Sequence, residues 1–140
     1  MPIETRMLPS GGRLWIVNGA LSGKEIIARN DAVFKMKAYE GVRWLIIDES
    51  QVTSVDLSTE EIGIITQQND RLASLLPKLV TAIIIPYDLG LGMARLWEIK
   101  TERQGWSSNI LRSRAEADAW VRQEVFNKFG TELPKDLSPI

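Results

Sequence analysis

The chain contains neither cysteine nor histidine. Without cysteine it has no disulfide, no thiol nucleophile and no cysteine-ligated zinc cluster. Without histidine it has no imidazole to act as a general base or proton relay. These two absences exclude most of the common catalytic constellations, and we expect a protein that is not an enzyme and carries no cofactor.

The sequence also lacks a charge excess and a long apolar run. Lysine and arginine number 17 against 18 acidic residues, for a net charge of −1, which gives no basis for binding nucleic acid or an anionic lipid surface. The longest apolar runs, such as residues 82–85, fall far short of the roughly 20 residues that span a bilayer. The first residues contain no apolar core of a signal peptide. We expect a cytoplasmic protein without an integral membrane segment.

A metal site is not expected either. Acidic residues do occur in the middle of the chain, but they lack the spacing of a calcium-binding loop. These residues are Asp48, Glu49, Asp56, Glu60 and Glu61.

What the sequence does contain is an alternation of apolar, β-forming segments with helical patterns. The expected strands cover residues 3–8, 13–17, 42–47, 79–85 and 106–111. The first two are joined by a Ser-Gly-Gly turn and form a hairpin, and a helix follows each of the others and the hairpin. The helix starts are marked by Ser22, Ser58, Asp88 and Ser113.

This order predicts an α/β fold with a mixed, mostly parallel sheet of about five strands and about four helices. Residues 42–47 are apolar at successive positions, which is typical of a strand covered on both faces and places it centrally. We expect one domain over residues 1–130, followed by a flexible C-terminal tail over residues 131–140.

The order of the segments resembles that of the STAS domain, and most closely its SpoIIAA-like branch, also described as STAS/SEC14-like. The resemblance covers roughly residues 13–125 and is carried by WLIID, DLSTEEI, IIIPYDLGLGMARLWE and LRSRAEADAWV. It implies the SpoIIAA-like fold and a bacterial regulatory protein that works by binding.

The resemblance also singles out Ser58. In regulatory STAS proteins an Asp-Ser-Ser-Gly turn after the central strand carries the serine that a partner kinase phosphorylates. Matching the central strands places Asp56, Leu57, Ser58 and Thr59 on that turn. Leu57 stands where the pattern has its first serine and Thr59 where it has glycine, and a β-branched threonine does not readily take a positive φ.

A structural explanation of Ser58 stands beside the regulatory one. The spacing from Ser58 to Glu61 is that of a capping box, in which the serine hydroxyl accepts a backbone hydrogen bond and the glutamate reaches back. The same spacing occurs at Ser22 and Ser113, so the chain begins several helices in this way.

The helix expected after Pro86 is the candidate ligand or partner surface. Its apolar side chains surround more of the helix than one contact with a sheet can cover. The residues proposed for this surface are Leu89, Met93, Arg95, Leu96 and Trp97. A Met and Trp ridge suits an acyl chain or a second subunit, whereas the alternative is that these side chains only pack the core and that Arg95 pairs with a nearby carboxylate.

Three functions follow from these observations. The first is a non-enzymatic binding or regulatory module that takes a protein partner, a second copy of itself, or a small apolar, lipid-like ligand near the helix after Pro86. The alternative is an anti-sigma-factor antagonist controlled by phosphorylation of Ser58. A weaker alternative is an enzyme that uses Asp48, Glu49 or Asp56 as acid and base, although turn and cap roles explain these carboxylates as well.

Overall fold

The computed structural model describes residues 3–35, 39–85 and 105–140. Its elements in chain order are β1 (Ile3–Met7), a 3-10 turn η1 (Pro9–Gly11), β2 (Arg13–Ser22), α1 (Gly23–Lys35), β3 (Trp44–Asp56), α2 (Thr59–Leu75), β4 (Val80–Ile84), β5 (Ser107–Leu111) and α4 (Arg114–Phe129). These elements confirm the predicted hairpin, the presence of the five strands and the helix starts at Ser22, Ser58 and Ser113. The helix predicted from about residue 89 to 103 lies outside the described residues.

The strands form one five-stranded sheet in the order β1-β2-β3-β4-β5. Strand β1 is antiparallel to β2, and β2, β3, β4 and β5 are parallel to one another. The mixed, mostly parallel sheet predicted from the sequence is therefore confirmed, with β3 at its centre. Parallel neighbours need crossover connections, which is why a helix follows β2 and β3.

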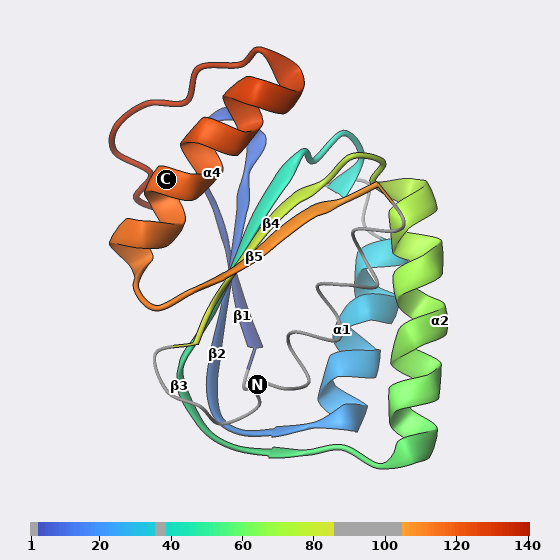
Figure 1. Ribbon diagram of the computed structural model, residues 1–140. Helices are drawn as coiled ribbons and strands as arrows, with labels where there is room; N and C mark the ends of the chain where they lie inside the picture. The colour runs from blue at the N-terminus through green and yellow to red at the C-terminus, as the bar shows by residue number, and fades with distance from the viewer. Residues whose placement is uncertain (1–2, 36–38, 86–104) are drawn as a thin grey trace.

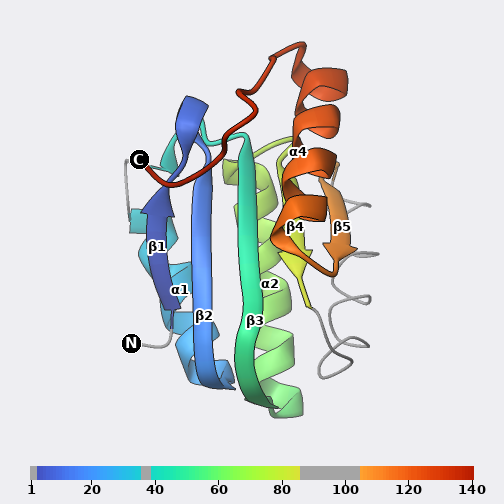
Figure 2. The same cartoon turned by 90° about the vertical axis from the view of Figure 1, so that its left-hand side faces the viewer.

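The helices cover both faces of the sheet. Figure 1 shows α1 and α2 side by side on one face and α4 on the other, and the turned view in Figure 2 shows α4 crossing in front of the sheet. Each face has its own buried core. The α1/α2 side includes Trp15, Val33, Leu45, Leu72 and Trp106. The α4 side includes Trp44, Ile46, Val80, Val121 and Leu137.

Strand β3 is much longer than predicted. We expected it to end at Asp48, a turn former that follows an apolar run, but the strand continues to Asp56. The reason is that β2 also continues, to Ser22, and pairs with β3 as far as the Ser22–Asp56 register. The stretch thought to link a strand to a helix is thus the second half of the strand, and it runs with β2 past the end of β4 (Figure 1).

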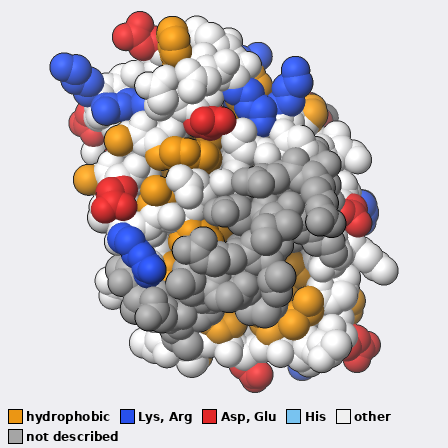
Figure 3. Space-filling model, viewed as in Figure 1, with side chains coloured by type: hydrophobic (Ala, Val, Ile, Leu, Met, Phe, Trp, Pro, Cys, Tyr) orange, Lys and Arg blue, Asp and Glu red, His pale blue; other side chains and the backbone are white. Residues whose placement is uncertain are grey.

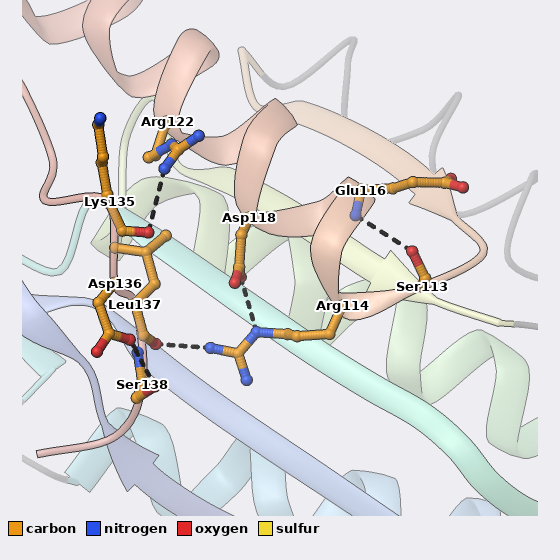
Figure 4. A network of polar contacts seen from close by, with 9 residues as sticks. All are labelled: Ser113, Arg114, Glu116, Asp118, Arg122, Lys135, Asp136, Leu137 and Ser138. Atoms are coloured by element: carbon orange, nitrogen blue, oxygen red, sulfur yellow. Dashed lines mark hydrogen bonds and ion pairs between the residues drawn. The ribbon is translucent and has the colours of Figure 1, made fainter.

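The C-terminal residues lie against the α4 side of the sheet. We expected residues 131–140 to be a flexible tail, whereas Leu133 and Leu137 are buried in the core on this side. The guanidinium of Arg114 donates to the Leu137 carbonyl at 2.6 Å, and Arg122 donates to the Lys135 carbonyl at 3.1 Å (Figure 4). The sequence shows neither helical nor strand periodicity here, so the burial of these residues could not be predicted from the local sequence.

None of the helices within the described ranges is both long enough and apolar enough to cross a membrane.

Trp44 provides a test of how tightly this fold is packed. It is 1% exposed, and a Cβ added to Gly12 would lie 2.2 Å from its indole ring. Gly12 has φ −72, which any residue adopts, so the cost of a side chain there comes from its overlap with the ring and not from the backbone angle. We expect Gly12→Ala to lower the free energy of unfolding by about 1–3 kcal/mol through overpacking, measured by urea denaturation.

The control is Gly63→Ala. Gly63 lies within α2 and an added Cβ would meet nothing within 4 Å, so this variant should gain about 0.5–1 kcal/mol from helix propensity. Equal effects of the two substitutions would contradict the contact between Gly12 and Trp44.

Candidate functional site

The start of α2 is a complete capping box. The backbone N–H of Glu61 donates to the Ser58 hydroxyl at 3.1 Å, and the backbone N–H of Ser58 donates to the Glu61 carboxylate at 2.9 Å. Ser58 has extended backbone angles, with φ −80 and ψ 161, as an N-cap residue should. The structural explanation of Ser58 is therefore confirmed.

The serine half of this arrangement also occurs at the start of the other described α-helices. The N–H of Glu25 donates to the Ser22 hydroxyl at 3.3 Å, and the N–H of Glu116 donates to the Ser113 hydroxyl at 3.2 Å. Ser113 and its bond appear at the start of α4 in Figure 4. What distinguishes Ser58 is its exposure: Ser58, Asp56 and Thr59 are exposed, whereas Ser22 and Ser113 are half-buried.

The carboxylate of Glu61 also touches the start of α1. A Cβ built on Gly23 would lie 2.5 Å from Glu61 Cδ and 2.7 Å from its Oε1. The two helix N-termini therefore lie next to each other, with one carboxylate between them. Anionic groups are stabilised at helix N-termini by the backbone dipoles.

Hydrogen bonding determines the ionisation of this carboxylate. The backbone N–H of Ser58 contributes most to lowering the pKa of Glu61 below its usual value, followed by the Ser58 hydroxyl, and Lys24 adds to the effect. Glu61 therefore carries a negative charge within a few ångströms of Ser58 at neutral pH, and this charge is held in position.

A methyl group at position 23 should release this carboxylate. We expect Gly23→Ala to move the Glu61 side chain away from Ser58, because the Cβ would overlap the carboxylate and the side chain is free to turn. The pKa of Glu61, measured by NMR titration, should then rise toward its ordinary value.

Gly63→Ala is the matched control, because it adds the same methyl group to α2 in open space. If the pKa of Glu61 is as low in Gly23→Ala as in the unaltered chain, the contact between α1 and Glu61 does not hold the carboxylate.

The carboxylates considered as an acid and base pair lie along β3. Asp48 accepts a hydrogen bond from the backbone N–H of Ser50 at 2.9 Å. This turn lies where the register shifts, since Ile16 faces Asp48 and Asn18 faces Gln51, so β3 carries an extra residue there. Asp48 therefore supports a β-bulge, in keeping with the turn role considered from the sequence.

Asp56 is distant from the other two carboxylates. It lies at the far end of β3, roughly 25 Å along the strand from Asp48 at the usual rise per residue. Asp48 and Asp56 therefore do not share a site. Within the described residues there is also no group of three acidic side chains that could hold a metal ion.

Glu49 has the most perturbed carboxyl group of the described residues. It is half-buried in the bulge. Burial, with a smaller contribution from the neighbouring Asp48, raises the pKa of Glu49 to about 7. The group is therefore partly protonated at neutral pH.

This shift makes stability depend on pH. The folded chain binds the Glu49 proton more tightly than the unfolded chain, so its contribution to stability is complete below the ordinary pKa of 4.5 and is lost as pH rises through about 7. We expect the free energy of unfolding to fall over this window by up to about 1.4 kcal/mol per pH unit. Urea denaturation across this pH range measures the slope.

Glu49→Gln should flatten this slope, because the amide resembles the protonated acid and does not titrate. Glu132→Gln, at an exposed position, should leave the slope as it is. An equal slope in the unaltered chain and in Glu49→Gln would contradict the assignment.

The apolar surface predicted after Pro86, with Leu89, Met93, Arg95, Leu96 and Trp97, lies outside the described residues. On the face in Figure 3, acidic and basic side chains are interspersed among the coloured residues. The described residues of this face therefore form no continuous basic area for a polyanion.

Sequence reasoning missed the role of Gly23. The available signal was a glycine at the first position of a helix, where better helix formers are usual. It showed that something approaches the backbone closely there, but the partner is 38 positions away at Glu61 and has no local signature.

Comparisons with known proteins identify the fold. No protein family model matches the chain, and no curated protein matches it. Solved structures do match. An uncharacterized protein of the DUF3478 family from Shewanella loihica PV-4, with a SpoIIAA-like fold, has a TM-score of 0.58 at 13% identity, covering 84% of this chain and 90% of its own.

Two structures of SpoIIAA match as well. The anti-sigma factor antagonist SpoIIAA in its unphosphorylated form has a TM-score of 0.50 at 16% identity, covering 86% of this chain and 97% of its own. The Bacillus cell fate determinant SpoIIAA in the phosphorylated form has a TM-score of 0.50 at 15% identity, covering 86% and 99%. The chain therefore has the SpoIIAA-like, STAS-type fold, which confirms the resemblance at the level of the fold.

Proposed function

We propose that this chain is a non-enzymatic regulatory module that binds a protein partner through the end of the molecule where α2 begins, and that phosphorylation of Ser58 controls this binding. The observation that carries the proposal is the exposed Ser58 hydroxyl, held in one position by the capping box at the end of a long strand. SpoIIAA, which shares the fold, is an anti-sigma factor antagonist with an unphosphorylated and a phosphorylated form.

The shape of this end suits a partner. Strands β2 and β3 run past β4 and pass into α1 and α2, so the two helix starts project together at the lower end of Figure 1. Thr53, Ser54, Asp56, Ser58 and Glu60 are exposed along this end. A partner would meet hydroxyls and carboxylates on a rigid support, which favours a polar, partly basic contact surface.

A phosphate on Ser58 would change this surface strongly. It would add about 1.5–2 negative charges at a helix N-terminus, where the dipole favours them. However, it would also meet the Glu61 carboxylate, which lies 2.9 Å from the Ser58 nitrogen. Repulsion would displace Glu61 from Ser58 and from Gly23, so phosphorylation would open the capping box as well as add charge.

The experiment compares two serines in similar caps. The chain is first incubated with serine kinases from its own source, and phosphate is mapped by mass spectrometry. We expect modification at Ser58 and none at Ser113, which is half-buried. Partners recovered with the unmodified chain are then purified, and their affinity is measured for Ser58→Asp and Ser113→Asp.

Aspartate keeps the N-cap acceptor and adds one negative charge at either site. We expect Ser58→Asp to change the Kd by roughly tenfold or more, or about 1.4 kcal/mol, and Ser113→Asp to leave it unchanged. If no phosphate is found at Ser58, phosphorylation of this residue does not control binding. If Ser58→Asp and Ser113→Asp bind the partner equally well, the surface around Ser58 is not the binding surface.

The lipid-like ligand near the helix after Pro86 and the carboxylate enzyme have less support. The residues for the ligand site lie outside the described part of the chain, and Asp48 and Asp56 lie far apart on β3. We therefore keep partner binding as the function that the described residues support best.

A further inference from the structure

The sequence contains one Asn-Gly pair, Asn18 and Gly19, and it lies in β2. In this dipeptide the asparagine amide is easily lost, because the backbone nitrogen of the next residue attacks the side-chain carbonyl carbon and glycine has no Cβ to obstruct the attack. Asn18 is exposed, so solvent reaches its amide. The function proposed above makes no use of this pair.

The backbone at Gly19 is open and irregular. Its φ is 74, and a Cβ built on it would meet nothing within 4 Å. A glycine with positive φ inside a strand is typical of a β-bulge. The register between β2 and β3 also shifts on both sides of the pair, between Ile16 and Asn18 and between Gly19 and Ala20. The ladder therefore restrains Asn18 and Gly19 less than a regular strand would.

The hairpin ladder ends just before this pair. The pairing of β1 with β2 runs from the Met7–Arg13 register to the Ile3–Val17 register, and Asn18 is the next residue along β2. Figure 2 shows the lower part of β2 continuing beyond β1. Asn18 therefore lies where the described part of β1 no longer supports β2.

The other four asparagines of the chain are held more firmly. Asn30 and Asn69 are buried within helices. The carboxamide oxygens of Asn109 and Asn127 accept hydrogen bonds at 2.9 and 2.8 Å. The side chain of Asn18 makes no hydrogen bond within the part of the chain that the structure describes. Its carboxamide is therefore free to turn toward the Gly19 nitrogen.

We propose that Asn18 is a site of spontaneous deamidation. Hydroxide removes the proton of the Gly19 backbone N–H, and this nitrogen attacks the carboxamide carbon of Asn18. The new C–N bond closes a succinimide ring as the C–N bond to the side-chain nitrogen breaks and ammonia leaves. Water then opens the ring at one of its two carbonyls, which gives aspartate or isoaspartate. In isoaspartate the backbone runs through the former side chain.

The reaction changes β2 ahead of the start of α1. Either product adds a negative charge at position 18, and isoaspartate also adds a methylene group to the backbone before Gly19. From this point β2 leads through its ladder with β3 to Ser22 and Gly23. Because a longer backbone misaligns this ladder, we expect the isoaspartyl chain to unfold at a lower urea concentration. The site does not depend on the function proposed for Ser58.

The experiment compares the folded chain with a synthetic peptide of residues 14–22, in which nothing restrains the backbone. Both are kept for several days at mildly alkaline pH and body temperature, and circular dichroism checks that the chain stays folded. Peptide mapping by mass spectrometry follows the loss of each amide. We expect Asn18 in the folded chain to react within roughly tenfold of the rate in the peptide, because the bulge needs little opening. Asn109 and Asn127 should not react measurably.

The matched variants are Asn18→Gln and Asn127→Gln, since both positions are exposed. Isoaspartate is detected by an isoaspartyl methyltransferase and a radioactive methyl donor. Glutamine would have to close a six-membered ring, which is far slower than closing the succinimide. Asn18→Gln should therefore abolish the labelling of the folded chain, and Asn127→Gln should leave it unchanged.

Two results would overturn the proposal. The first is a reaction of Asn18 that is more than roughly tenfold slower in the folded chain than in the peptide, which would show that the strand protects the amide. The second is isoaspartate labelling that persists in Asn18→Gln, which would place the reaction at another residue.

Discussion

The parallel pairing of β2 with β3 is the constraint on which the rest of the molecule depends. It is the longest ladder of the sheet, running from the Arg13–Leu45 register to the Ser22–Asp56 register. Both strands end at the same edge, and each passes directly into a helix on the same face. The starts of α1 and α2 must therefore lie together, and this is why a carboxylate on one helix contacts the first residue of the other.

This pairing also explains why the molecule has two different ends. Beyond β4, β2 and β3 continue as a two-stranded ribbon that needs local support, which the Asp48 turn and the register shifts provide. At the other end, where β3 begins, the hairpin turn, α4 and the C-terminal residues converge around Trp44. One end presents hydroxyls and negative charge, and at the other the Arg43 guanidinium lies over the Phe129 ring. A fold does not determine function by itself, so function depends on the side chains that these ends present.

Local signals made much of the fold predictable. The caps at Ser22, Ser58 and Ser113 are sequence patterns within four residues, and the apolar runs at β3 and β4 are continuous, so their places could be found without the structure. The length of β3 could not be predicted from the sequence, because Asp48 is a turn former whether it ends a strand or supports a bulge. Three further features could not be predicted either, because each depends on residues distant in sequence: the contact of Gly23 with Glu61, the burial of Leu137 and the environment of Glu49. The capping pattern located Ser58 at the start of α2, whereas the depression beside Arg43 is lined by separate segments and no motif marks it.

The two cores are completed at different points along the chain. All members of the core on the α1/α2 side precede residue 107, ending with Trp106, whereas the core on the α4 side needs Leu133 and Leu137. A chain made from its N-terminus can therefore assemble the first layer while the other face of the sheet is still uncovered. During that interval Trp44, Ile46 and Val80 face water, so the second layer is the one whose late arrival exposes apolar surface to a chaperone or to another nascent chain.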